Sequence, residues 1–132
     1  MTTLTPMLVA GDRSAVDVLA HELMHSWSGN LTTSASWSSF WLNEGWTVWL
    51  ERLLLNEIHG KDGPAHRGFS YIIGAKALED ALLQFKDQPK FQRLVPVFEG
   101  YQDPDDAFSS IPCECLYFCL CSSRRADRAL LV

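Results

Sequence analysis

The segment His21-Glu22-Leu23-Met24-His25 combines residue types at a spacing suited to metal-dependent chemistry. If this segment is helical, His21 and His25 lie one turn apart on the same face, so both imidazoles can bind one ion. Glu22 then lies about 100° around the helix from His21, where it can reach a water molecule on the metal without being a ligand itself. A general base requires such a position.

A third metal ligand must come from another part of the chain. A catalytic zinc ion typically has three protein ligands and leaves a fourth position for water. Glu44, in the segment Asn43-Glu44-Gly45-Trp46, is the natural candidate, because it lies in a second helical segment with its own start signal. The alternative is a pair of surface histidines beside a carboxylate. We therefore expect one Zn²⁺ held by His21, His25 and Glu44. Glu22 is the expected catalytic base.

The first metal-binding segment has the apolar periodicity of a helix. Apolar residues recur on the face opposite the histidines, at Val16, Leu19, Ala20, Leu23 and Trp27. Ser14 followed by Asp17 has the form of a capping box, which places the start of the helix near Ala15. Gly29-Asn30 is a common C-terminal signal, so the predicted helix ends there.

A second helix is predicted from a cap at Asn43 to about Ile58, with an end signal at Gly60. Glu51 lies about two turns after Glu44 and thus on nearly the same face. Its carboxylate could orient a metal ligand from behind, or it could be a solvated surface charge. Both interpretations stay open at this point.

Tryptophan is concentrated around these two segments, at Trp27, Trp37, Trp41, Trp46 and Trp49. The pattern predicts a packed aromatic wall that keeps the two metal-binding helices in register. A sugar-binding aromatic platform is the functional alternative.

The rest of the chain favours a mainly α-helical fold with at most a short N-terminal strand. Residues 3–10 mix β-branched and apolar residues around a proline, which suits an edge strand or an extended lead-in. An apolar stripe predicts a third helix over Phe69–Phe85, and the prolines of residues 90–112 predict irregular structure there. His59 and His66 have no partner at ligand spacing, so we expect surface residues.

Composition excludes several classes of function. The 132 residues suffice for one domain, and 47% apolar with 20% charged residues is typical of a globular protein. The net charge of −5 argues against nucleic acid as a partner, because phosphate binding needs a basic surface. No apolar run approaches the length of a membrane span, and the first residues lack the features of a signal peptide. The expected compartment is the cytoplasm.

All four cysteines lie between Cys113 and Cys121. Disulfides across such short spacings would be strained, so a secreted disulfide framework is not expected. A second zinc site built from these thiols is the alternative, although one intervening residue is fewer than zinc ligand pairs normally have. The pattern favours a segment of free thiols.

Together the motifs resemble the zinc aminopeptidases of the gluzincin clan, and within it the leukotriene A-4 hydrolase group and its fungal-type relatives. The resemblance extends over most of the chain, and the residues that carry it lie in the stretches 4–6, 11–14, 21–30, 40–48 and 103–112. The resemblance implies that residues 1–112 are the helical part of a thermolysin-like zinc metallopeptidase catalytic domain. The β-sheet that normally covers these helices would precede Met1, so we expect exposed apolar surface.

The resemblance also implies a function. It indicates an aminopeptidase that hydrolyses short peptides with zinc-activated water. It also indicates an additional epoxide hydrolase activity on a fatty-acid epoxide, because Asp105 matches a family residue that is linked to this activity. The alternative is a zinc-binding but catalytically inactive fragment or pseudoenzyme, in which the ligands survive without the substrate apparatus.

Cys113 marks a break in the resemblance. Family members have a tyrosine after the Ile-Pro step, which donates a hydrogen bond to the developing oxyanion, whereas this chain has Cys113. A family glutamate that holds the substrate's amine would lie before Met1. Residues 113–132 look unrelated to the family, and we expect a tail that arises from a frame change or unspliced sequence. The chain looks like a fragment of a larger enzyme, with weak activity or none on its own.

Overall fold

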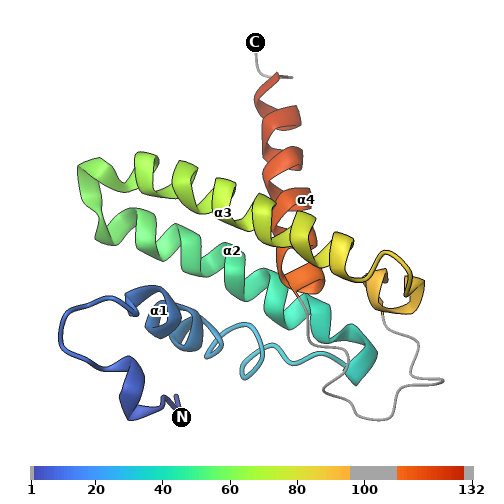
Figure 1. The fold of residues 1–132 in the computed structure, drawn as a ribbon. Helices are drawn as coiled ribbons and strands as arrows, with labels where there is room; N and C mark the ends of the chain where they lie inside the picture. Colours follow the sequence, from blue (N-terminus) through green and yellow to red (C-terminus); the bar gives the residue numbers. More distant parts are fainter. Residues whose placement is uncertain (1, 96–109, 130–132) are drawn as a thin grey trace.

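A computed structural model describes residues 2–95 and 110–129 of the chain (Figure 1). Four α-helices form the fold: α1 (Val16–Met24), α2 (Phe40–Ile58), α3 (Gly63–Gln84) and α4 (Ser110–Ala129). Short 3-10 helices occupy Pro6–Leu8, Trp37–Ser39, Gly60–Asp62 and Pro89–Gln92. Within the described ranges the only β pairing is an isolated bridge between Ser28 and Thr32. The prediction of a mainly α-helical fold is therefore confirmed. No described helix has the length and apolar character needed to cross a membrane.

Helix α2 is the centre of the arrangement, because it packs against each of the other three helices (Figure 1). Helices α1 and α3 lie on either side of it, and α4 also packs against α3. The apolar core draws on several helices, through Ala20, Phe40, Val48, Leu55, Ala81, Ile111 and Tyr117. A helix that is covered on several sides holds its side chains in a defined orientation, which suits α2 to carry a functional carboxylate.

Close approach of α4 to α2 depends on Gly45. A Cβ atom built at Gly45 would overlap the side chain of Leu116, with Leu116 Cδ2 only 2.8 Å away. Only glycine leaves room for the two helices at this distance. Because Gly45 directly follows Glu44, α4 covers α2 beside the predicted metal ligand.

Helix α1 ends earlier than predicted, at Met24 rather than at Gly29-Asn30. After His25 the chain forms turns in which Asn30 N donates to His25 O at 3.0 Å and Gly29 N donates to Thr32 O at 2.9 Å. Gly29 has a φ of +128°, which an L side chain rarely adopts. Gly29 therefore shapes the compact loop after the helix and does not end the helix itself.

The predicted capping box at the start of α1 does not form. The N-cap residue is Ala15, which has no side chain able to cap, while Ser14 Oγ and Ser14 N both bond to Asp12 Oδ1, at 2.7 and 3.0 Å. Because Ser14 is bonded to Asp12, its hydroxyl is not available to cap the helix. Asp17 does lie in the first turn, where its charge complements the helix dipole.

Two other helix starts differ from prediction. Helix α2 begins at Phe40 with its cap at Ser39 rather than at Asn43, because the 3-10 turn over Trp37–Ser39 leads directly into it. Helix α3 begins at Gly63 rather than at Phe69, with a proline in its first turn, where the missing N–H costs nothing. The predicted end of α2 at Ile58 is confirmed.

Of the two structures that the sequence allows for residues 3–10, the edge strand does not form. Residues Pro6–Leu8 form a 3-10 turn closed by Leu8 N to Thr5 O and Val9 N to Pro6 O, each at 3.1 Å. An edge strand needs a neighbouring strand to accept its backbone bonds, and the described ranges contain none.

The predicted tryptophan wall is also wrong for most of its members. Trp27 is 53% exposed, Trp37 42% and Trp46 39%. Trp46 and Trp49 do meet edge to face, with ring centroids 5.6 Å apart. Polar contacts around the histidines, described below, also join α1 and the loop after it to α2.

Residues 113–129 belong to α4, which runs without interruption across the predicted boundary at residue 113. Ile111, Glu114 and Tyr117 lie on one face and are all buried, with Ile111 and Tyr117 each 1% exposed. Glu114 makes two bonds to Arg52 of α2, at 2.7 and 3.0 Å, and the Arg52 guanidinium lies 4.0 Å from the Tyr117 ring centroid. The first turns of the predicted tail therefore pack into the core.

Helix α3 leaves a row of apolar side chains exposed to solvent, in line with the exposed apolar surface that the sequence predicts. Phe69, Ile72 and Ile73 share one face and are each more than half exposed. The stripe that predicts α3 thus points mainly to solvent, and α3 packs against its neighbours through small residues such as Gly74 and Ala81.

Candidate metal centre

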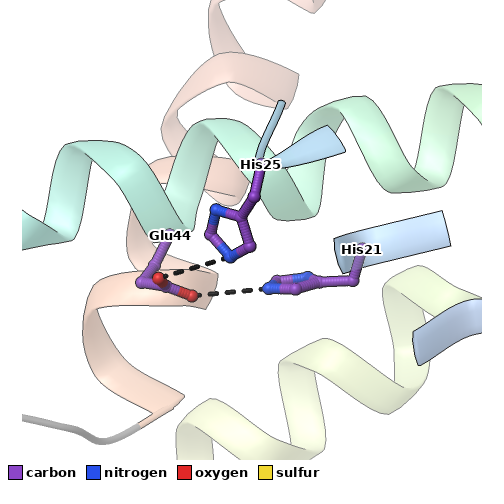
Figure 2. Close-up of side chains that lie close together, drawn as sticks. All are labelled: His21, His25 and Glu44. Carbon is purple, nitrogen blue, oxygen red and sulfur yellow. Dashed lines mark ion pairs between the residues drawn. The ribbon is translucent and has the colours of Figure 1, made fainter. Parts of the chain in front are cut away.

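Three of the predicted site residues converge between α1 and α2. His21, His25 and Glu44 each offer one ligand atom, and these atoms all lie within 4.8 Å of one another. Figure 2 shows both imidazoles turned toward the Glu44 carboxylate, with His21 Nε2 3.4 Å from Oε2 and His25 Nε2 3.6 Å from Oε1. His21 comes from the last turn of α1, His25 directly follows that helix, and Glu44 is in the second turn of α2.

The donor set and its spacing fit a zinc ion. Tetrahedral zinc with bonds of about 2.0–2.1 Å places neighbouring ligand atoms roughly 3.3–3.4 Å apart, close to both nitrogen–oxygen distances. The side chains are 14–23% exposed, so the site is partly buried but open to solvent. Two neutral imidazoles and one carboxylate would leave a bound Zn²⁺ with a net positive charge.

Glu51 supports His21 from behind. Its Oε2 lies 3.0 Å from His21 Nδ1, on the side of the ring away from Glu44. Of the two interpretations of Glu51, the structure favours the carboxylate that orients a ligand over the solvated charge. Burial lowers the pKa of His21, but the hydrogen bonds to Glu44 and Glu51 outweigh it and raise the pKa to about 9.

His25 has a different, uncharged support. Its Nδ1 lies 2.9 Å from the Ser28 carbonyl oxygen and 3.1 Å from Thr47 Oγ1. Sequence reasoning missed both partners. A backbone carbonyl has no signature in the sequence, and Thr47 is recognisable only once α1 and α2 are packed together.

Glu22, the predicted base, follows His21 on α1 and is partly buried. The group of potential ligands does not include it. This placement is compatible with a residue that acts on water rather than on the metal.

Cys113 lies on α4 near the carboxylates of the site. Burial raises the pKa of its thiol to about 12, and the charges of Glu44 and Glu114 add to the increase. The thiol therefore stays protonated at neutral pH, as a weak hydrogen-bond donor. None of the four cysteines, which all lie in the described part of α4, forms a disulfide. Asp105, linked by resemblance to epoxide hydrolysis, lies outside the described residues.

His59 and His66 are not part of this centre. Their rings stack on each other where α2 leads into α3, with centroids 4.0 Å apart and planes 21° apart. His59 is exposed and His66 half-buried. The surface location predicted for the pair is confirmed for His59, whereas the sequence did not indicate their contact.

Comparison with known proteins connects this geometry to a family. The model of the peptidase family M1 domain matches residues 2–115. Leucine aminopeptidase 2 of Sclerotinia sclerotiorum is 57% identical over 113 residues, and a leukotriene A-4 hydrolase homolog of Botryotinia fuckeliana is 55% identical over 113 residues. These matches cover 86% of this chain but only 18% and 17% of the relatives.

Solved structures show the same likeness. The structure of yeast LTA4 hydrolase in complex with bestatin superposes with a TM-score of 0.79 at 49% identity, over 92% of this chain and 19% of that one. The native enzyme from Saccharomyces cerevisiae gives the same values. The chain thus spans less than a fifth of the proteins it matches.

Proposed function

Because the chain belongs to peptidase family M1, we propose that it carries the zinc site of an aminopeptidase, with His21, His25 and Glu44 as ligands and Glu22 as general base. The observation that carries the proposal is the convergence of the three ligand side chains within 4.8 Å, with both nitrogen–oxygen distances close to those of tetrahedral zinc. The donor set of two imidazoles and a carboxylate also matches that of catalytic zinc sites.

Each residue has a distinct part in the proposed reaction. A zinc ion bound by the three ligands would supply a Lewis acid that acidifies water and polarises the peptide carbonyl. Glu22 takes a proton from the attacking water as the oxygen–carbon bond forms, and returns it to the leaving amine as the carbon–nitrogen bond breaks. Glu51 keeps the His21 ring in the orientation that directs Nε2 to the Glu44 side.

The proposed substrates are short peptides. Relatives named leucine aminopeptidase 2 support removal of an N-terminal residue such as leucine, and relatives named leukotriene A-4 hydrolase support an additional epoxide hydrolase activity. The chain spans less than a fifth of the length of those relatives. Both activities are therefore proposed for the metal site, which this chain shares with the family, and not for the chain alone. A cytoplasmic location stays a prediction.

A second candidate function is a zinc-binding chain with little or no turnover. Cys113 favours it, because a half-buried thiol with a pKa of about 12 is a weak donor in the place where the resemblance implies a phenol. Loss of one oxyanion donor costs on the order of 10²- to 10³-fold in turnover. The ligand cluster itself does not depend on this residue.

Metal analysis and an aminoacyl-anilide assay test both candidates together. The purified chain should hold close to one equivalent of zinc, and His21→Ala or His25→Ala should lose most of it. Unchanged zinc in both variants would refute the ligand assignment. Glu22→Gln should retain zinc while abolishing any hydrolysis; a zinc-loaded wild-type chain with no hydrolysis to abolish would support the second candidate.

A further inference from the structure

We propose that Thr47 is a positioning residue for the metal centre, because its hydroxyl and the Ser28 carbonyl hold His25 with Nε2 directed at the metal. This inference rests on the proposed zinc site, and it concerns a residue with no ligand role of its own. Thr47 is fully buried, at 0% exposure, and lies one turn after Asn43 on α2.

The contacts of His25 determine which ring nitrogen carries the proton. Nδ1 lies 2.9 Å from the Ser28 carbonyl oxygen, which can only accept a hydrogen bond. Nδ1 must therefore carry the proton, and this leaves the lone pair of Nε2 free on the side of Glu44, 3.6 Å from Oε1. The same tautomer is the one that a zinc ligand needs.

The Thr47 hydroxyl acts as a second acceptor for that proton. The hydroxyl lies 2.7 Å from the Asn43 carbonyl and 3.2 Å from the Ser28 carbonyl, so its hydrogen is donated to the nearer acceptor, within α2. The oxygen lone pairs are then free to accept from His25 Nδ1, 3.1 Å away. Because Thr47 is inaccessible to solvent, no water can take over this role if the hydroxyl is removed.

The loop after α1 is tied to the same point of α2. Ser28 Oγ donates to the Asn43 carbonyl at 3.0 Å, so Ser28 and Thr47 share one acceptor directly before Glu44. Gly29 allows the loop to pass this close, since a Cβ atom there would lie 3.3 Å from His25 Nδ1. The network therefore links the orientation of His25 to the backbone that carries the third ligand.

The two histidines are thus held by different chemistry. His21 faces the carboxylate of Glu51, whereas His25 faces two uncharged acceptors. Loss of Thr47 should disturb the geometry of the site while leaving its charge unchanged. Changes to residues that support metal ligands typically reduce metal affinity 10- to 100-fold, and the lower end is expected here because the Ser28 carbonyl remains.

Three variants test the proposal. Thr47→Val keeps the shape and removes the hydroxyl, Thr47→Ser keeps the hydroxyl, and Thr33→Val is a matched control. Thr33 Oγ1 donates to the Gly29 carbonyl at 2.6 Å in the same loop, but it is exposed and its hydroxyl bonds only to the loop backbone. Zinc dissociation constants come from competition with a chromophoric chelator, and the visible spectrum of the Co²⁺-substituted protein reports ligand geometry.

We expect Thr47→Val to bind zinc about 10-fold more weakly and to alter the Co²⁺ spectrum, with Thr47→Ser and Thr33→Val close to wild type. Wild-type affinity and spectrum in Thr47→Val, or an equal loss in Thr47→Ser, would overturn the role of the hydroxyl while leaving the zinc proposal intact. Absence of zinc binding by the wild-type chain would overturn both.

A measurement without metal keeps the inference testable if Thr47→Val does not fold. Nitrogen NMR of the wild-type, metal-free protein distinguishes the two neutral tautomers of each histidine. We expect His25 to show a slowly exchanging proton on Nδ1. A neutral His25 ring protonated on Nε2 instead would overturn the proposed hydrogen bonds to Ser28 and Thr47.

Discussion

Removal of the Glu114 side chain should strongly destabilise the fold, because it leaves a buried arginine without its partner. Glu114→Ala deletes both bonds to Arg52, whose side chain is only 8% exposed. Breaking a buried ion pair from one side typically costs about 3–5 kcal/mol. That is a large share of the roughly 5–15 kcal/mol that stabilises a domain, and corresponds to a fall in melting temperature of roughly 10–20 °C.

Two further variants separate this explanation from a general effect of the substitution. Glu79→Ala removes a carboxylate that meets Lys76 at 3.3 Å on the surface, and it should leave the melting temperature unchanged. The double variant Arg52→Met with Glu114→Leu should regain most of the loss, since an apolar pair of similar size can replace a buried ion pair.

Thermal unfolding followed by circular dichroism measures all of these variants. A Glu114→Ala melting temperature equal to that of Glu79→Ala would refute the reasoning, because it would mean that α4 is not docked on α2 through this pair. The result bears directly on residues 113–132, whose first turns contribute Glu114 and Tyr117 to the core.

Three other predictions concern the metal centre. Glu51→Gln keeps the size of the side chain but removes the charge beside His21 Nδ1, so zinc affinity in chelator competition should fall 10- to 100-fold. Unchanged affinity would show that Glu51 does not orient this ligand. Cys113→Tyr should raise aminoacyl-anilide turnover of the zinc-loaded chain by on the order of 10²- to 10³-fold, and no gain would show that this position does not serve the oxyanion. In metal-free protein, the pKa of His21 is raised to about 9 from an ordinary value of 6.5, so its stabilising contribution is complete below pH 6.5 and is lost as the pH rises toward 9. Melting temperatures measured in chelator should therefore decline across that range, and the decline should be shallower in Glu51→Gln; a flat wild-type profile would contradict the proposed pairing.

Much of the site could be predicted because it depends on local geometry. The period of an α-helix places His21 and His25 on one face whatever surrounds them, and α1 does contain or adjoin both residues. Glu44 required the further step of assigning a second helix, and the structure brings its carboxylate to both rings. The start of that helix was predicted four residues late, but this did not matter, because Glu44 is helical in either case.

Other features could not be predicted because they depend on which helix faces meet. The sequence left Glu51 undecided, since a carboxylate on a helix is solvated or buried according to its neighbour, and here that neighbour is His21. Arg52 and Glu114 are far apart in the chain, and neither has a local pattern that indicates a buried pair. The prediction that the tryptophans are buried failed for the same reason. Their size and apolar character favour burial, but burial also needs a partner surface, which the sequence does not reveal.

The amino-acid sequence by itself determined the helical character of the chain, the residue types of the metal centre and the resemblance to a peptidase family, because each is encoded in short stretches with a regular period. Tertiary structure alone decided how the centre is supported: a carboxylate behind His21, and a carbonyl and a hydroxyl behind His25. The physical reason is that a hydrogen bond depends on distances of a few tenths of an ångström between side chains from different helices. Those distances are fixed only when α2 is packed between α1, α3 and α4.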